Sequence, residues 1–252
     1  MHTARTVAAI FNISVAYLGS AHATAPLPRC EARSGARPPA VVELYTSEGC
    51  SSCPPADRWL STLRDQPGLL PLAFHVNYWN HLGWQDRFAT PATTQRQHEV
   101  RAALNGRYVY TPQVVLNGQD HRDWRGQSPA KVAAQGTLSA SGAPSLALSR
   151  SGSTVTASVG ALNETSKLAG YWAVLQDGLS SRVTRGENAG ETLTHDHVVS
   201  LYQPVNAWSA AQPTRWQLVL PEGPAFDALR VAFVVTRPDR VTPVQALALN
   251  CP

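Results

Sequence analysis

A Cys-Ser-Ser-Cys motif at residues 50–53 limits the fold of this chain more than any other feature, because it lies between a strand pattern and a helix pattern. Residues 39–47 are rich in β-branched and apolar side chains, which predicts a buried strand. Residues 54–66 place apolar side chains at helical spacing before a Pro-Gly stop. Two cysteines at such a junction form a redox pair, a local structural disulfide or a metal clamp.

The segments after this motif continue to alternate between strands and helices, which favours an α/β domain with a mixed sheet flanked by helices at 39–140. The helix that starts at Thr90 is expected to turn Val100, Ala103 and Leu104 inward. The predicted elements are a strand at 69–79, an irregular insert at 80–91, a helix at 90–106, a strand ending in an Asn-Gly turn at 109–118 and a helix at 129–140.

The remaining part of the chain, 144–252, shows strand patterns without an intervening helix. Two alternating runs around a Ser-Gly turn predict a hairpin at 145–162. Further strands are predicted at 168–178, 215–223, 229–239 and 241–249. This part is therefore predicted to be a small all-β sandwich-like domain.

The amino-terminal residues 1–23 have the pattern of a signal peptide: a basic start, an apolar run and an Ala-His-Ala cleavage site. We expect the mature protein to be periplasmic or secreted, with residues 24–38 as an extension and no membrane contact after cleavage. A lipoprotein reading at Cys30 is disfavoured because Arg29 occupies the position that requires a small residue.

The net charge is +4 and the basic residues are scattered, so no nucleic-acid partner is expected. No cofactor is expected either. The expected partners are exported proteins or small thiols that act as substrates.

The chain has four cysteines, which allow three disulfide pairings in an oxidising compartment. Cys50 and Cys53 are close enough to pair with each other. That leaves Cys30 and Cys251, whose structural disulfide would tie the two ends of the mature chain together.

The predicted activity is thiol–disulfide exchange at Cys50 and Cys53. The start of a helix carries a partial positive charge, which stabilises a thiolate and makes Cys50 the nucleophile. Cys53, one turn later, would resolve the mixed disulfide. The alternatives are a non-catalytic binding module with a structural Cys50–Cys53 disulfide, and a module that binds Cu(I) through soft thiolates.

The stretch TPQVVLNG at 111–118 is similar to a stretch of glutaredoxins in which a cis-proline faces the Cys-x-x-Cys pair. This resemblance implies that Pro112 is cis and that the backbone of Thr111 pairs with an extended substrate. Four blocks, at 42–57, 74–86, 109–118 and 185–199, resemble a family of secreted thioredoxin-like bacterial proteins called domain of unknown function 1223. The family implies export and a thioredoxin-like fold for 39–140, but no established activity.

Four aromatic residues form the predicted substrate pocket, although a buried strand at 74–79 whose alternate residues pack on helices explains the first three equally well. They are His75, Tyr78, Trp79 and Trp84.

Several other polar residues have two interpretations. Asp86 is a candidate proton-transfer acid, but its loop position favours simple solvation. His195 and His197 alternate on a strand pattern and could share a metal. Two ligands leave such a site incomplete, so we predict a polar surface or interdomain contact and no metal site. Glu187 and Asn188 are expected to build a turn.

Overall fold

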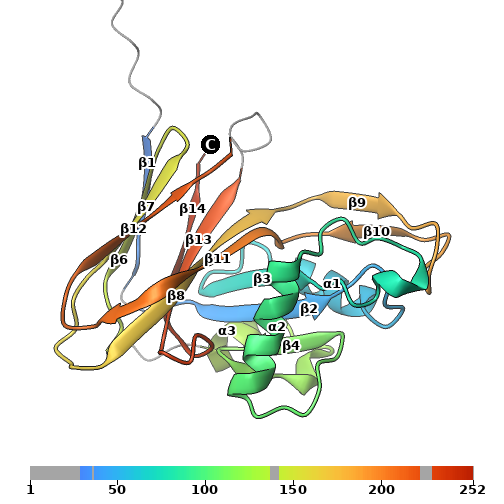
Figure 1. Ribbon diagram of the computed structural model, residues 1–252, viewed down its shortest axis with the longest axis horizontal. Coiled ribbons are helices and arrows are strands. Elements are labelled where there is room, and N and C mark those ends of the chain that lie inside the picture. Colours follow the sequence, from blue (N-terminus) through green and yellow to red (C-terminus); the bar gives the residue numbers. More distant parts are fainter. Residues whose placement is uncertain (1–28, 36, 137–141, 222–228, 252) are drawn as a thin grey trace, which may run out of the picture.

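The computed structural model describes residues 29–35, 37–136, 142–221 and 229–251 (Figure 1). The signal peptide predicted at 1–23 and the first residues of the extension lie outside the described residues. Within the described ranges, no helix has both the length and the apolar character that crossing a bilayer requires.

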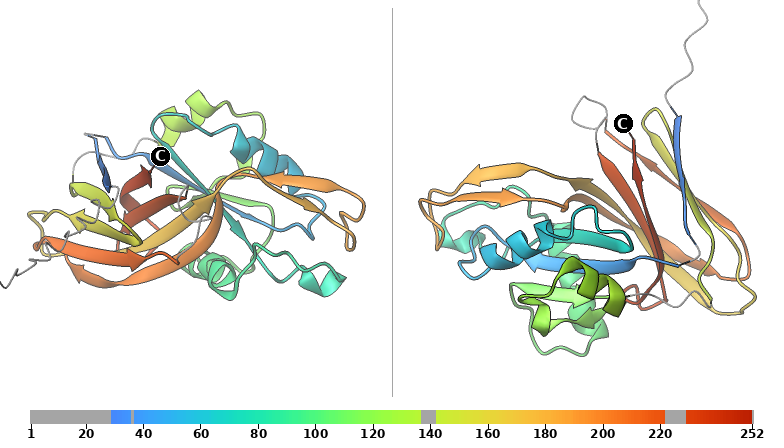
Figure 2. Two further views of the ribbon diagram at one scale, coloured as in Figure 1. Left: turned by 90° about the horizontal axis from the view of Figure 1, so that it is seen from above. Right: turned by 180° about the vertical axis from the view of Figure 1, so that it is seen from behind.

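One large mixed sheet of eight strands organises the chain (Figures 1 and 2). The strand order is β14-β13-β8-β11-β3-β2-β4-β5, so four strands from the second half of the sequence continue directly into four strands from the first half, and the two groups meet where β11 pairs with β3. The bounds are β2 Ala40–Thr46, β3 Leu69–His75, β4 Gln113–Leu116, β5 Gln119–Asp120, β8 Lys167–Gln176, β11 Val198–Ser209, β13 Arg230–Thr236 and β14 Pro243–Asn250.

Three α-helices connect or follow the strands of the first half. They are α1 Pro54–Ser61, α2 Pro91–Ala103 and α3 Pro129–Gly136, with short 3-10 turns η1 at Asn80–Leu82 and η2 at Arg122–Trp124. The helix α2 starts at a capping box, because Thr90 and Thr93 satisfy each other's backbone N–H groups.

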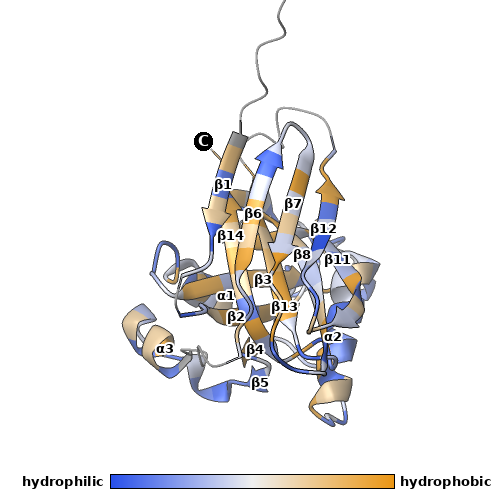
Figure 3. Ribbon diagram, turned by 90° about the vertical axis from the view of Figure 1, so that its left-hand side faces the viewer, coloured by the Kyte–Doolittle hydropathy of each residue, from blue (hydrophilic) through white to orange (hydrophobic). Residues whose placement is uncertain are grey.

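A second sheet of four strands, β1-β6-β7-β12, packs against β8, β13 and β14. Its strands alternate hydrophilic and hydrophobic residues, as a sheet with one solvated face requires (Figure 3). A separate hairpin, β9-β10, extends past α1 (Figure 1). The bounds are β1 Arg29–Arg33, β6 Leu146–Ser151, β7 Thr154–Val159, β9 Leu179–Arg182, β10 Thr192–His195 and β12 Thr214–Val219.

Alternation along the strands of the large sheet divides the core into three clusters. One face, with Tyr45, Phe74 and Tyr171, is covered by α2. The opposite face is shared: α1 covers β2, β3 and β4 through Trp59 and Leu60, α3 adds Val132, and the four-stranded sheet covers the other end. The strands β2 and β3 are buried along nearly their whole length, which explains their continuous apolar patterns.

The predicted fold class, a helix-flanked α/β thioredoxin-like domain followed by a small all-β sandwich-like domain, is wrong. Of the residues that the structure describes, 42% are in strands and 16% in helices, and the large mixed sheet runs across both predicted parts. The two predicted parts share one sheet because the edge of β3 that does not face β2 pairs in parallel with β11, at Ala73 and Val198. Local patterns identify strands but not their partners.

The strand β11 is itself missing from the sequence-based prediction. It runs over twelve residues and pairs with β8. Gln203, Pro204 and Asn206 interrupt its apolar pattern, and a proline inside a run argues against a strand. The strand tolerates Pro204 at the position opposite Tyr171.

A buried ion pair lies between the large sheet and α2. Arg96 is fully buried and donates to Oε1 of Glu43 over 2.7 Å. The same carboxylate accepts hydrogen bonds from the hydroxyls of Tyr171 and Tyr45. The ring of Tyr171 also lies under the guanidinium, with 4.7 Å from its centroid to Cζ of Arg96. Every charge of this cluster therefore has a partner, which a buried charge requires.

Candidate functional site

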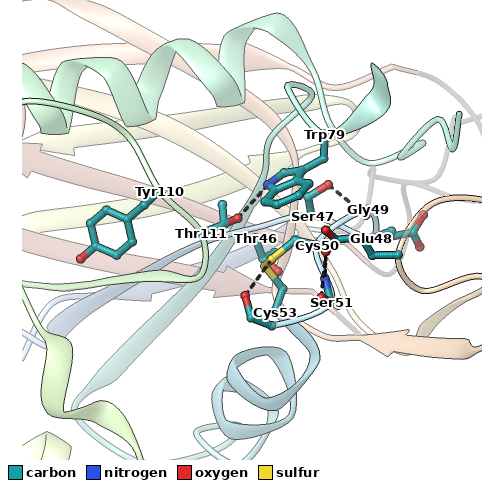
Figure 4. Close-up of a disulfide and its surroundings, with 12 residues drawn as sticks. Thr46, Ser47, Glu48, Gly49, Cys50, Ser51, Cys53, Trp79, Tyr110 and Thr111 are labelled. Atoms are coloured by element: carbon teal, nitrogen blue, oxygen red, sulfur yellow. Dashed lines mark hydrogen bonds between the residues drawn. A yellow bond between two sulfur atoms is a disulfide. The ribbon is translucent and has the colours of Figure 1, made fainter. Parts of the chain in front are cut away.

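Cys50 and Cys53 form a disulfide in the connection between β2 and α1 (Figure 4). The backbone approaches it through two successive turns, in which Cys50 N donates to Ser47 O and Cys53 N donates to Cys50 O, each over 3.1 Å. Both cysteines are completely buried, whereas Ser51 and Ser52 between them are exposed. In this disulfide form Cys50, the predicted nucleophile, is therefore no more exposed than Cys53.

The helix α1 begins at Pro54, directly after Cys53. Prolines at the first two helical positions have no N–H, so neither can donate to a sulfur. The next two N–H groups, of Ala56 and Asp57, both donate to Cys53 O. The start of α1 therefore has fewer N–H groups free to stabilise a cysteine thiolate than the sequence suggests. A closer donor is the hydroxyl of Ser52, whose Oγ lies 3.4 Å from Sγ of Cys50.

Trp79 and Thr111 lie beside the disulfide (Figure 4). Nε1 of Trp79 donates to Oγ1 of Thr111 over 2.8 Å, and the Thr111–Pro112 peptide bond is cis, as the resemblance implies. Gly49 allows the tryptophan to approach, because a Cβ on Gly49 would be only 2.9 Å from Cβ of Trp79. The tryptophan therefore links the cysteine turn to the Thr111 segment.

A pocket of about 410 Å³ opens next to the motif. Ser52 forms its edge on the side of the disulfide, and Thr111 and Pro112 form part of its wall. The remaining walls are aromatic and basic. They come from Tyr108, Tyr110, Val114, His121, Arg122, Trp124 and Arg125.

The connection between β9 and β10 holds the cysteine turn from the other side. The amide group of Asn188 donates to Glu48 O over 2.8 Å and to Cys50 O over 3.0 Å. The exposed carboxylate of Glu187 accepts from both N and Oγ of Ser51, over 2.9 and 2.8 Å. These hydrogen bonds lower the pKa of Glu187. Glu187 and Asn188, predicted only to build a turn, fasten that turn to the disulfide.

A buried polar cluster lies under the motif, at the ends of β2, β3 and β10. His75 Nδ1 lies 2.7 Å from Oδ2 of Asp86, and His195 Nε2 lies 3.2 Å from Oε1 of Glu48. Asp57, on α1, accepts from Thr46 Oγ1 over 2.9 Å. The rings of His75 and His195 meet edge to face at 4.8 Å. Five separate segments of the chain thus contribute to one charged cluster.

In this cluster, burial disfavours the charged form of each group, whereas neighbouring charges and hydrogen bonds favour it, and the balance sets the direction of each pKa shift. Burial raises the pKa of Asp57, and the two histidines compensate only partly. For His75 burial disfavours the charged ring, but Asp86, Asp57 and Glu48 outweigh it and raise its pKa. Burial likewise opposes ionisation of Glu48 and Asp86, yet hydrogen bonds and the imidazoles lower the pKa of both carboxyls.

The four residues of the predicted substrate pocket have different hydrogen-bond partners, although the rings of Tyr78 and Trp79 lie together at 6.4 Å. Only Trp79 lies beside the disulfide. His75 belongs to the buried cluster, and Trp84 donates from Nε1 to Oε2 of Glu48 over 2.8 Å. The hydroxyl of Tyr78 donates to Gln97, and burial raises the pKa of this tyrosine to about 12.

The solvated state expected for Asp86 is wrong. Asp86 is 3% exposed, and its carboxylate accepts from the N–H groups of Glu48 and Phe88 in addition to its contact with His75. For His195 and His197 we expected a polar surface or an interdomain contact, and the polar surface is wrong, because both residues are buried. His195 does contact the other predicted part of the chain, through Glu48 and Asp57.

His195 and His197 face different surroundings. The chain has a positive φ of 59° at His197, which breaks the strand alternation between β10 and β11. His197 Nδ1 lies 2.6 Å from the guanidinium of Arg230 and 3.4 Å from Asp177. The two rings therefore belong to separate clusters.

Acidification is expected to destabilise the protein through His197. Burial, followed by Arg230, lowers its pKa to about 4, although Asp177 acts in the opposite direction. In the unfolded chain the ring titrates near 6.5. This stabilisation is complete above pH 6.5 and is lost as the pH falls toward 4.

Between pH 7 and pH 5 the loss from His197 is about 2 kcal/mol. Urea unfolding of the parent and of His197→Asn at both pH values measures it, with the exposed His98→Asn as control. An equal pH dependence in parent and His197→Asn would contradict the assignment.

Cys30 and Cys251 form the second disulfide, with 5.8 Å between their Cα atoms. Cys30 lies on the edge strand β1, and Cys251 follows β14. The bond joins the two sheets near both ends of the described chain.

The family model for proteins of unknown function (DUF1223) matches residues 41–236. The chain belongs to this family. An X-ray crystal structure of an Agrobacterium tumefaciens protein is 30% identical, with a TM-score of 0.65 over 84% of this chain and 94% of that one. Among the curated proteins, no sequence matches.

A likeness to HBP35 of Porphyromonas gingivalis shows the fold alone. It is 15% identical, with a TM-score of 0.55 over 85% of this chain and 76% of that one. The matched DUF1223 segment runs from β2 to the end of β13 and therefore contains both Cys50 and His195.

Sequence reasoning missed two residues of this DUF1223 site, Glu48 and Asp57. The sequence context of each residue could have indicated a functional role. Glu48 stands in an otherwise small and polar turn, and Asp57 occupies the buried face of an amphipathic helix. A carboxylate on a buried helix face requires a partner, and this requirement is the signal that points to the cluster.

Proposed function

We propose that this protein is a thiol–disulfide oxidoreductase that uses the Cys50–Cys53 pair. The observation that carries the proposal is the arrangement at the β2–α1 junction. A disulfide closes a loop of only two intervening residues, and a pocket begins at one of them, Ser52. So short a loop constrains the unfolded chain little, so the bond contributes less to stability than a disulfide that closes a long loop.

The exchange conserves atoms and electrons in two steps. A substrate thiolate attacks Sγ of Cys50, forms a mixed disulfide and releases Cys53 as a thiolate. A second substrate thiolate then attacks the substrate sulfur of the mixed disulfide and releases Cys50. The substrate dithiol is oxidised to a disulfide, and the protein pair accepts two electrons. The hydroxyl of Ser52 is placed to donate to the Cys50 thiolate.

The substrates we propose are exported proteins or small thiols. The second disulfide, Cys30–Cys251, supports an oxidising compartment, periplasmic or extracellular. The pocket beside Ser52 offers aromatic walls and the guanidinium groups of Arg122 and Arg125, which suit an extended peptide with aromatic or acidic side chains.

A permanent structural disulfide is the second candidate, and the complete burial of both sulfurs favours it. The two candidates differ in reduction potential. A structural bridge has a potential below about −300 mV, whereas an exchanging pair is more oxidising.

The decisive experiment traps the intermediate. Reduced Cys53→Ser, mixed with the disulfide of a short cysteine peptide, is expected to accumulate a mixed disulfide on Cys50, detected by mass spectrometry. Cys50→Ser is the matched control and should trap much less. A potential well below about −300 mV, with no trapped adduct in either variant, would establish the structural bridge instead.

A further inference from the structure

Asp57, His75 and His195 form a set of three potential metal ligands. The atoms of this set that face one another, called the inner atoms, are Oδ1 of Asp57, Nε2 of His75 and Nδ1 of His195. One potential ligand atom from each residue lies within 4.8 Å of the others, and all three residues are buried. Oδ1 of Asp57 is 4.0 Å from Nδ1 of His195. Two imidazoles and a carboxylate are the donors that Zn²⁺ binds in three-ligand sites.

The outer atoms of the same three residues are already held. Asp86 fixes Nδ1 of His75, Glu48 fixes Nε2 of His195, and Thr46 donates to Oδ2 of Asp57. Metal-binding histidines usually show this arrangement, in which a carboxylate on the far nitrogen sets the tautomer and aims the near one.

The inner ring nitrogens have no partner among the described residues. Nε2 of His75 and Nδ1 of His195 are both buried without a hydrogen bond. Their side chains are 0% and 2% exposed. A buried polar atom without a partner is costly, and two that converge on one carboxylate need a common explanation.

We propose that Asp57, His75 and His195 bind a divalent transition-metal ion of the zinc type. Asp86, Glu48 and Thr46 orient the ligands. Phe88 packs edge to face against both imidazoles, at 5.2 and 5.4 Å, and forms an apolar wall beside the site. A small pocket of about 140 Å³ between α1 and β10 is lined by Asp57 and His195 and provides a route to the surface.

The charge of the cluster suits such an ion. Three carboxylates and two imidazoles face one another, so the cluster is strongly negative when the imidazoles are neutral. A dication would compensate this charge, and because a histidine must be neutral to bind a metal, binding should release protons from the imidazoles.

This site is neither of the two metal sites that the sequence suggested, the cysteine pair and the pair His195 and His197. His195 takes His75 as its neighbour rather than His197, and no cysteine is a ligand. The inference is therefore independent of the proposed exchange activity, although Asp57 N donates to Cys53 O at the start of α1.

Zinc binding by the full mature protein tests the proposal. Chelator-treated protein, with both disulfides intact, is expected to bind one Zn²⁺ in calorimetry and to release protons. Co²⁺ should give the visible absorption of a low-coordinate nitrogen–oxygen site. On the parent protein, nitrogen NMR of the imidazoles should shift two histidines upon adding Zn²⁺. This measurement needs no variant that must fold.

Variants then assign the ligands. His195→Gln and Asp57→Asn should lose the binding, and Asp86→Asn should weaken it about 10- to 100-fold because only the orientation is lost. His98→Gln and His197→Asn are the matched controls and should bind like the parent. The double variant with serine at Cys50 and Cys53 should also bind, so failure of the redox proposal leaves this one intact.

Three outcomes would overturn the inference. They are no binding by the parent, unchanged binding by both His195→Gln and Asp57→Asn, and binding that disappears with the two cysteines. The last result would show that the ion depends on the cysteine turn rather than on the three ligands alone. If the cluster is only a buried proton-exchanging network, the parent protein will not bind zinc.

Discussion

Arg96→Met is expected to destabilise the protein by about 3–5 kcal/mol, the cost of breaking a buried ion pair by removing one partner. The guanidinium is fully buried and bonded to Glu43, and its other arm donates to Arg240 O over 2.6 Å. Methionine fills a similar volume but leaves the Glu43 carboxylate without its cation. Only the hydroxyls of Tyr45 and Tyr171 then remain to solvate that charge.

Urea unfolding of Arg96→Met measures this loss, with Arg107→Met, which replaces an exposed arginine after α2, as the control. The double variant Glu43→Gln with Arg96→Met should recover a large part of the stability, because the unpaired charge is then gone. A single-variant loss no larger than that of Arg107→Met would show that the pair contributes nothing.

The pair at Glu43 and Arg96 also shows what a local pattern can and cannot predict. The helix at α2 was predicted, with Val100, Ala103 and Leu104 facing inward. Val100 is buried, but Ala103 is exposed, and polar residues make up the rest of the buried face. Thr93, Arg96 and Gln97 are buried because they bond to the strands beneath, which hydropathy cannot detect.

The strands of the first half were predictable because both faces of β2 and β3 are covered and their sequences are continuously apolar. Their position in the sheet was not. Pairing of β3 with β11 joins residues more than a hundred positions apart, and no periodicity encodes such a register. The error in the fold class follows from this single non-local pairing and from the missed strand itself.

At the candidate site, the sequence identified what lies close along the chain. The Cys-x-x-Cys motif and the Thr111–Pro112 step carry their own spacing signals. The charged cluster does not, because Glu48, Asp57, His75 and His195 come from four segments and meet only through the sheet and the β9–β10 hairpin. Only position within an element gave a signal: His75 lies inside a buried strand and Asp57 on the buried face of a helix, and a polar side chain at either place requires a partner.

Asn188→Ala is expected to speed the reaction of the Cys50–Cys53 disulfide with a small reductant by about 5- to 150-fold. Both sulfurs are buried, so reaction requires a local opening of the cysteine turn. Asn188 is 6% exposed and its amide holds the carbonyl groups of Glu48 and Cys50 closed. Losing a buried hydrogen-bond partner costs about 1–3 kcal/mol, which corresponds to that range of opening constants.

The measurement is the rate at which a phosphine reductant exposes the two thiols, followed by alkylation and mass spectrometry. Glu191→Ala, an exposed change in the same β9–β10 connection, is the control and should react like the parent. The Cys30–Cys251 disulfide serves as an internal standard in every sample, because it lies away from the hairpin at the ends of the chain. If Asn188→Ala and the parent react at the same rate, the β9–β10 connection does not control access to the sulfurs. If the rate rises at Cys50–Cys53 alone, a substrate that displaces Asn188 would gain the same access.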